Sequence, residues 1–265
     1  EPGAHAALAM PVEFVGGMMM LIRAVEGAMD LTVLEPRMAP DFPKTPFDFV
    51  ALTPAQSHAL SADKEQLHRM KGWKTLLLGG AAVRAEWLRG LPSSMRVFES
   101  FGMTETISHF AVRQWLPVQE EVFRCLEGME VSCSSQGALQ VHRVGFPVLQ
   151  SNDAAEVMDS RTFRWLGRLD DVINSGGVKV HPHAVSTVLS SMISLPFMVY
   201  GRPHDDLGEE VVLRIHANEE PENADEFRAS IQHLVLESLP RYHAPRSIEW
   251  KPLEKTQSGK WKSPR

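Results

Sequence analysis

Apolar residues form short runs in the first part of the chain, and stretches with helical spacing lie between them. The runs have the length of buried strands and cover residues 6–11, 31–34, 47–52 and 74–78, and another strand is predicted over residues 96–100. Apolar positions spaced for one helix face occupy residues 16–27 and 54–70, and a further helix is predicted to begin within 83–88. Strands that alternate with helices favour a mostly parallel sheet in an α/β domain.

The pattern changes after Ile107. Residues 128–141 and 144–165 contain short strands and turn residues rather than long helices, which predicts a β-rich subdomain. Further strands are predicted within 172–180, 198–201, 211–217 and 247–250, with helices at 182–192 and 224–238. We therefore expect a large mixed α/β domain with a β-rich subdomain over residues 1–169 and a small α+β domain over residues 170–265.

Composition narrows the functional classes. The chain has 265 residues and a formal charge of −6, and it contains no basic block, so we do not expect a nucleic-acid partner. Its most apolar run, residues 18–22, is far too short to cross a bilayer, which takes about 20 residues, so no membrane insertion is expected. Two cysteines, Cys125 and Cys133, make no disulfide framework and favour a reducing, cytoplasmic setting.

The turn after residues 96–100 is the first candidate for chemistry. Gly102 ends the predicted strand, and Thr104 and Glu105 follow it. Open α/β sheets place ligands at the carboxyl ends of their strands. A threonine hydroxyl can donate to a phosphate oxygen, and a carboxylate can hold Mg²⁺ beside phosphates. The alternative is a helix cap, because threonine followed by an acid is common there.

Three further positions have a chemical and a structural interpretation. Gly79, Gly80 and Ala81 follow a strand and offer a bare backbone for a flat ring, or simply a tight turn into a helix. Asp153 offers two oxygens to a vicinal diol, or forms an Asx turn. Arg168 offers a rigid cationic fork to ribose or phosphate, or forms a surface ion pair.

Two glycines and a lysine near the end of the chain complete the candidates. Gly176 and Gly177 follow Ser175 in a loop that could equally be a hairpin turn. Lys260, in a Ser-Gly-Lys loop, could neutralise charge that builds up on a phosphate, although a terminal lysine is more often a solvated charge.

Taken in order, these motifs resemble the adenylate-forming superfamily of acyl-CoA synthetases, luciferases and peptide-synthetase adenylation domains. Within it, residues 102–108, 10–19 and 166–179 resemble the o-succinylbenzoate-CoA ligases of menaquinone biosynthesis. The resemblance implies two steps. A carboxylate first attacks the α-phosphorus of MgATP and gives an acyl-adenylate; the thiol of CoA then displaces AMP. The implied cofactors are ATP, Mg²⁺ and CoA, and the other partner is a small carboxylic acid.

The resemblance also implies roles for individual residues. Thr104, Glu105 and Lys260 would be catalytic, with Glu105 holding Mg²⁺, and Asp170 would be the hinge about which the small domain rotates. Phe14, Ser108 and His109 would line the acyl pocket. The nucleotide and CoA would be bound by Gly79, Gly80, Ala81, Phe101, Gly102, Asp153, Arg168, Gly176 and Gly177. Of these, Thr104, Glu105, Asp153 and Arg168 are expected to converge on one cleft.

The sequence departs from the family pattern in two places. Many relatives carry histidine or another aromatic residue where this chain has Phe14, which removes one polar contact. The Gly/Ser/Thr-rich phosphate loop with its lysine is missing and is expected before residue 1, so the chain would be the C-terminal part of a longer enzyme.

Three other functions stay open. They are activation of a different acid, loading of a carrier protein, and nucleotide binding without catalysis by a paralogue. A homodimer is left open as an oligomeric state.

Overall fold

A computed structural model describes residues 1–254 and Lys262, and gives the backbone alone at Glu86. Internal contacts divide the chain into two compact units. The first unit comprises Glu1–Ser132, Gln140–Leu149 and Val157–Arg164. The second comprises Cys133–Leu139, Gln150–Glu156 and Trp165–Arg265. Among the described helices, none is both long and apolar enough to cross a membrane.

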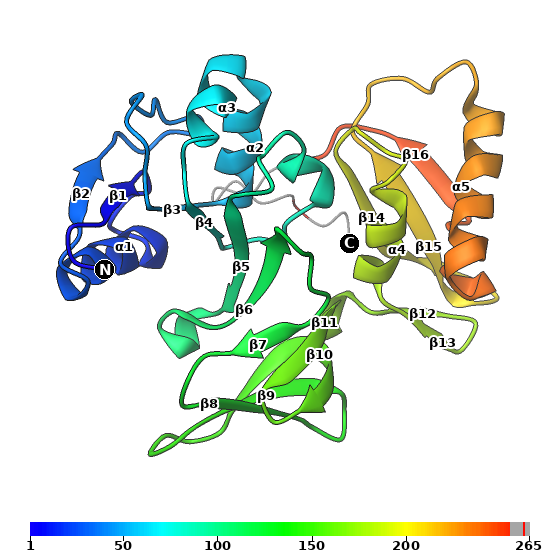
Figure 1. Ribbon diagram of the computed structural model, residues 1–265. Helices are drawn as coiled ribbons and strands as arrows, with labels where there is room; N and C mark the ends of the chain where they lie inside the picture. The colour runs from blue at the N-terminus through cyan, green and yellow to red at the C-terminus, as the bar shows by residue number, and fades with distance from the viewer. Residues whose placement is uncertain (255–261, 263–265) are drawn as a thin grey trace. The chain divides into compact units, whose positions relative to one another are not determined.

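The larger sheet begins with parallel strands, as the alternating pattern predicts. These are β1 (His5–Leu8), β2 (Asp30–Val33), β3 (Phe49–Leu52), β4 (Thr75–Leu78) and β5 (Arg96–Gly102), paired in the order β2-β1-β3-β4-β5. The sheet continues in the order β6 (His109–Leu116), β7 (Phe123–Cys125), β11 (Thr162–Arg168), β10 (Leu149–Asp159), β9 (Ala138–Arg143) and β8 (Met129–Cys133). The pairs β5–β6, β6–β7 and β7–β11 are antiparallel. Figure 1 shows the first five strands beside α1 (Val15–Glu26), α2 (Pro54–Ala62) and α3 (Lys64–Met70).

The expected helix over residues 54–70 is broken at Asp63. Asp63 has extended backbone angles, φ −90° and ψ 120°, and its side chain accepts hydrogen bonds from the backbone N–H groups of Glu65 and Gln66. An aspartate that caps a new helix in this way ends the preceding one. The helix expected from residue 83 is only a 3₁₀ turn, η1 (Ala85–Leu88).

The core of the first unit packs beneath the parallel strands. Phe42, Phe47 and Trp73 form one ring cluster, with centroids of Phe42 and Trp73 4.6 Å apart, and Leu76 and Leu78 of β4 are fully buried against it. Burying this apolar area supplies the main free energy that holds the strand ends, and the loops beyond them, in place.

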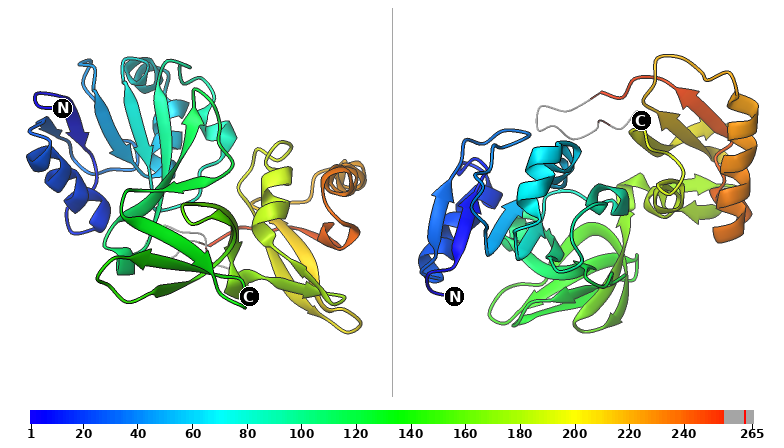
Figure 2. Two further views of the ribbon diagram at one scale, coloured as in Figure 1. Left: turned by 60° about the horizontal axis from the view of Figure 1, so that its bottom comes forward. Right: turned by 45° about the horizontal axis from the view of Figure 1, so that its top comes forward.

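A second, smaller sheet is built only from strands between Ile173 and Trp250. It contains β12 (Ile173–Ser175), β13 (Val178–Val180), β14 (Phe197–His204), β15 (Gly208–Ile215) and β16 (Ser247–Trp250). Figure 2 shows α4 (Pro182–Leu189) and α5 (Ala224–Ser238) beside this sheet, and both helices share its apolar core. The short helical turns of the described chain are completed by η2 (Thr104–Thr106), η3 (Leu169–Asp171) and η4 (Arg241–His243). The mixed α/β class with a large sheet is thus confirmed.

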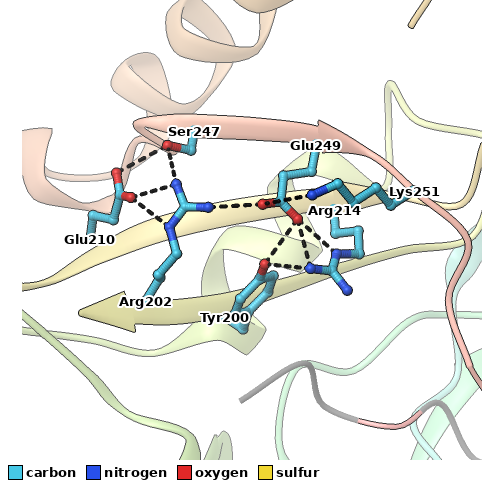
Figure 3. Close-up of polar contacts among 7 residues, drawn as sticks. All are labelled: Tyr200, Arg202, Glu210, Arg214, Ser247, Glu249 and Lys251. Atoms are coloured by element: carbon cyan, nitrogen blue, oxygen red, sulfur yellow. Dashed lines mark hydrogen bonds and ion pairs between the residues drawn. The ribbon is translucent and has the colours of Figure 1, made fainter. Parts of the chain in front are cut away.

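Strand residues that alternate with this apolar core carry a paired set of charges (Figure 3). Glu249 accepts hydrogen bonds from the Tyr200 hydroxyl at 3.1 Å, from Arg202 at 2.8 Å and from Arg214 at 2.9 Å. Arg202 also reaches Glu210 and Ser247. Burial alone would raise the pKa of Glu249, but hydrogen bonds from Arg214 and Tyr200 outweigh it and hold that pKa below its usual value. The charged side chains of this cluster are therefore paired with one another by hydrogen bonds and ion pairs.

Candidate active site

The glycine turn after β4 lies against β5. The Gly79 N–H donates to the carbonyl of Leu52 at 3.1 Å, and the Ser100 hydroxyl donates to the carbonyl of Leu78 at 3.0 Å. A Cβ atom at Gly79 would lie 2.5 Å from Ser100 Oγ, so any side chain there would displace the Ser100 hydroxyl. The backbone of the turn is thus fixed at the carboxyl end of the parallel strands, where open sheets bind ligands.

Glu99 ties this turn to its neighbours, and the sequence analysis missed it. Its carboxylate is buried, with 5% of the side chain exposed. It accepts hydrogen bonds from Arg113 Nε and Trp115 Nε1, each at 2.8 Å, and from the Val83 N–H at 3.2 Å. The signal available in the sequence was an acid in the middle of a predicted strand, directly after Val97 and Phe98.

The turn after β5 presents Thr104 and Glu105. A register shift separates Phe101 from Gly102, and a Cβ atom at Gly102 would lie 2.4 Å from His109 Cα, so the close approach of β5 and β6 requires glycine. Phe101 packs at this point against three phenylalanine rings, Phe110, Phe123 and Phe163.

Thr106 closes the same turn by accepting from the Met103 N–H at 3.0 Å. Thr104 and Glu105 are exposed, and their side chains have no partner within the described part of the chain. Glu105 supplies one carboxylate, and no group of three or more His, Cys, Asp or Glu side chains able to hold a metal lies within the described residues. Mg²⁺ bound with nucleotide phosphates needs only one or two carboxylates, so Glu105 fits such an ion.

His109 is uncharged and is held by an arginine that the sequence analysis missed. Arg23 Nη2 lies 3.1 Å from His109 Nδ1, although 86 positions separate them, and Ser108 Oγ lies 3.3 Å from the same nitrogen. Burial, and then the charge of Arg23, lower the pKa of His109 to about 4. Because Arg23 has only donors, Nδ1 must accept and the ring proton must sit on Nε2.

We expect the His109 ring to stay neutral, with its proton on Nε2, as the pH falls from 8 to about 5. The folded pKa lies below the ordinary value of 6.5, so the unfolded chain takes up this proton first. The contribution of neutral His109 to the free energy of unfolding is therefore lost as the pH falls from about 6.5 towards 4. Imidazole ¹⁵N shifts, assigned with His109→Gln, would measure this; in Arg23→Gln the pKa should rise. A ring that titrates near 6.5 in the wild type would contradict this charge state.

In the second unit, Asp153 is held by a tryptophan. Trp165 Nε1 donates to Asp153 Oδ1 at 2.9 Å, and the Asp153 N–H donates to Ser151 Oγ at 3.1 Å. The Trp165 ring contacts that of His183, with centroids 4.5 Å apart. A carboxylate has about four acceptor positions, so Asp153 keeps acceptor capacity for a ligand while its orientation is fixed.

Arg168 forms an ion pair with Asp170 in this structure. Its Nε and Nη2 atoms each lie 3.1 Å from one oxygen of Asp170, and both side chains are about half exposed. Hydrogen bonding to Arg168 lowers the pKa of Asp170, with a smaller contribution from Asn152. The expected ribose-binding arginine and the expected hinge aspartate are thus partners.

Gly176 and Gly177 make the turn between β12 and β13, where Ser175 pairs with Val178. Both have positive φ, +59° and +79°. A Cβ atom at Gly176 would lie 2.7 Å from Cε1 of Tyr242, whereas one at Gly177 would meet nothing within 4 Å. At Gly176, glycine is favoured both by the positive φ and by the lack of space for a side chain. At Gly177 it is favoured by the positive φ alone.

The candidate residues thus fall into two groups. The first unit contains Phe14, Gly79 to Ala81, Phe101 to Glu105, Ser108 and His109; the second contains Asp153, Arg168, Asp170, Gly176 and Gly177. Phe14 occupies the N-cap position of α1 without a side-chain capping hydrogen bond and is 69% exposed. Lys260 lies outside the described residues.

Known proteins similar to this chain point to one family, although no protein-family profile matches it. An acetyl-coenzyme A synthetase of Bacillus subtilis is 35% identical over 115 residues, which are 42% of this chain and 20% of that protein. A 2-succinylbenzoate–CoA ligase of Staphylococcus epidermidis is 23% identical over 96% of this chain and 60% of its own length. This chain therefore spans less than two thirds of these curated relatives.

A solved structure from Dyadobacter fermentans matches almost the entire chain. That protein, described as an acyl-CoA synthetase (AMP-forming)/AMP-acid ligase II-like protein, is 31% identical. The comparison covers 99% of this chain and 77% of that one, with a TM-score of 0.60. A shared fold, this identity and the glycine, threonine and glutamate turns at the strand ends agree with the resemblance in the sequence. The chain belongs to the AMP-forming acyl-CoA synthetases of the adenylate-forming superfamily.

Proposed function

We propose that the protein is an ATP-dependent carboxylate–CoA ligase, an acid–thiol ligase that acts through an acyl-adenylate in the cytoplasm. The observation that carries this proposal is the turn after β5, where Thr104 and Glu105 stand exposed and unpartnered within the described chain at the end of a parallel strand. Structural side chains in such a turn would be occupied as caps, as Thr106 is.

In the first step a carboxylate oxygen attacks the α-phosphorus, and the bond to pyrophosphate breaks. Thr104 would donate to a phosphate oxygen, and Glu105 would hold Mg²⁺, which supplies positive charge beside the phosphates. The bare backbone of Gly79 to Ala81 would lie along the adenine ring, with Asp153 on the ribose hydroxyls. Lys260 would neutralise the charge that gathers on the α-phosphate.

In the second step the CoA sulfur attacks the acyl carbon, and the bond to AMP breaks. The Gly176 and Gly177 turn would line the path of the thiol. We propose that the boundary between a large domain of residues 1–169 and a small domain of residues 170–265 lies at Asp170, whose backbone would act as the hinge.

We propose 2-succinylbenzoate as the acid, which would place the enzyme in menaquinone biosynthesis. The support is that the Staphylococcus epidermidis ligase matches 96% of this chain. The second candidate is an acetate-like acid, because the acetyl-coenzyme A synthetase has a higher identity over a shorter segment.

Acid-dependent exchange of labelled pyrophosphate into ATP tests both the activity and the acid. We expect exchange by the native protein without CoA, fastest with 2-succinylbenzoate in a panel that also holds acetate and simple aryl acids. Exchange with acetate alone would replace the proposed acid. Binding of ATP with no exchange for any acid would favour the non-catalytic, nucleotide-binding alternative.

A further inference from the structure

Trp165 gives the carboxylate of Asp153 a partner that only donates. The two residues lie on neighbouring strands, β11 and β10, and Trp165 Nε1 is 2.9 Å from Asp153 Oδ1. An ionised carboxylate has no donor of its own, so every further group that binds Asp153 must bring a proton or a positive charge. Ribose hydroxyls can donate, whereas the ionised oxygens of a nucleotide's phosphates can only accept. The carboxylate of Asp153 therefore suits the sugar of a nucleotide rather than its phosphates.

The contacts around Asp153 leave one of its oxygens for a ligand. Oδ1 is held by the indole, and the backbone N–H of Asp153 donates to Ser151 Oγ at 3.1 Å. Arg168, a cation at the end of β11, gives its two hydrogen bonds to Asp170 instead. Within residues 1–254, Oδ2 of Asp153 accepts no hydrogen bond. Because two adjacent hydroxyls need both oxygens in place, the side-chain torsion that the indole fixes decides whether both can bind.

His183 supports the indole ring. The centroids of the Trp165 and His183 rings are 4.5 Å apart, and the ring planes are inclined by 50°. Glycine at position 167 allows this approach, because a Cβ atom there would lie only 3.3 Å from His183 Cβ. His183 belongs to the first turn of α4, which is anchored by Val185 and Leu189 in the core of the smaller sheet. The side chain that orients Asp153 is therefore itself supported by a helix fixed in that core.

We propose that Trp165, supported by His183, is a positioning residue that orients Asp153 for the two ribose hydroxyls. The proposal rests on the proposed function and adds two residues to its nucleotide site. Trp165 acts through Asp153 and not on the nucleotide directly. Its N–H therefore governs the preference for a ribonucleotide over a deoxynucleotide, rather than the affinity for the base or the phosphates.

Calorimetric titration with AMP, 2′-deoxy-AMP and 3′-deoxy-AMP tests the inference without requiring turnover. We expect the native protein to bind AMP roughly 10- to 150-fold more tightly than either deoxynucleotide, the range for a hydrogen bond to a charged group. Trp165→Phe keeps a ring beside His183 but has no N–H. It should reduce this preference by about 2- to 12-fold, the range for an ordinary hydrogen bond. General damage would instead weaken the binding of all three nucleotides by one factor and leave the preference unchanged.

Three further variants separate the hydrogen bond from the ring contact. His183→Phe keeps a ring against the indole and should retain most of the preference, whereas His183→Ala should lose part of it. Trp250→Phe replaces an indole of the same unit that contacts Phe227, and it should change nothing. An unchanged preference in Trp165→Phe would overturn the proposal, as would a native protein that binds all three nucleotides equally. If pyrophosphate exchange fails for every acid but a preference for AMP is present and depends on Trp165, the proposed function is wrong and the ribose site remains.

Discussion

Replacing Lys260 by alanine is expected to slow acyl-adenylate formation by roughly 10²-fold or more, the scale for one electrostatic contact to a developing charge. The ammonium group is needed while negative charge gathers on the α-phosphate and not afterwards. The same variant should therefore convert supplied acyl-adenylate to the CoA thioester at nearly the wild-type rate. The two rates are measured separately, by pyrophosphate exchange and by thioester formation from synthetic adenylate.

Gly176 provides the opposite variant. A side chain there would crowd Tyr242 beside the proposed thiol path, so Gly176→Trp should slow thioester formation and leave adenylate formation intact. Because φ is positive at Gly176, any side chain there also strains the backbone. Gly177→Ala is the control for this strain, because φ is positive there too and no atom lies within 4 Å of the added Cβ. Equal loss of both steps in Lys260→Ala would mean that Lys260 is structural.

Replacing Glu99 by alanine is expected to destabilise the first unit by about 3–5 kcal/mol, the cost of removing one partner of a buried ion pair. Arg113 and the Trp115 indole would lose their shared acceptor, and the Val83 N–H would lose its partner. Urea denaturation followed by tryptophan fluorescence and far-UV circular dichroism would measure this change. Because the chain has two compact units, each transition should be fitted separately.

The matched control is Glu65→Ala, which removes the exposed i,i+4 partner of Arg69. Loss of this exposed ion pair should lower the free energy of unfolding by only a few tenths of a kcal/mol. Glu99→Ala should also raise the KM for ATP, because the turn that follows Gly79 is then less firmly held. A loss of stability as small as that of the control would show that Glu99 does not support the turn.

The sequence predicted the parts of this fold that depend on local pattern. The strands β1, β3 and β4 follow from apolar runs, because a strand buried on both faces has no polar side to show. The turns after β4 and β5 could also be predicted from the sequence. Both contain glycine, the residue that allows another group to approach the backbone closely. Their roles came from the family resemblance and not from spacing.

The remaining features arise from side-chain contacts that no local sequence pattern marks. Arg23 and His109 are 86 positions apart, and no periodicity links a helix terminus to that strand. The indole that orients Asp153 was likewise invisible, because tryptophan in a strand is ordinarily an apolar residue. Arg168 and Asp170 are two positions apart, and a surface ion pair was one of the two interpretations of Arg168, but the sequence did not identify Asp170 as its partner.

The most direct test of the account is a single-turnover experiment on the native protein with ATP, Mg²⁺ and 2-succinylbenzoate and without CoA. Quenched samples are analysed by mass spectrometry for the acyl-adenylate. We expect one adenylate per released pyrophosphate, and its conversion to thioester and AMP when CoA is added. Bound ATP that gives no adenylate with this acid or any other in the panel would contradict the assignment of ligase activity.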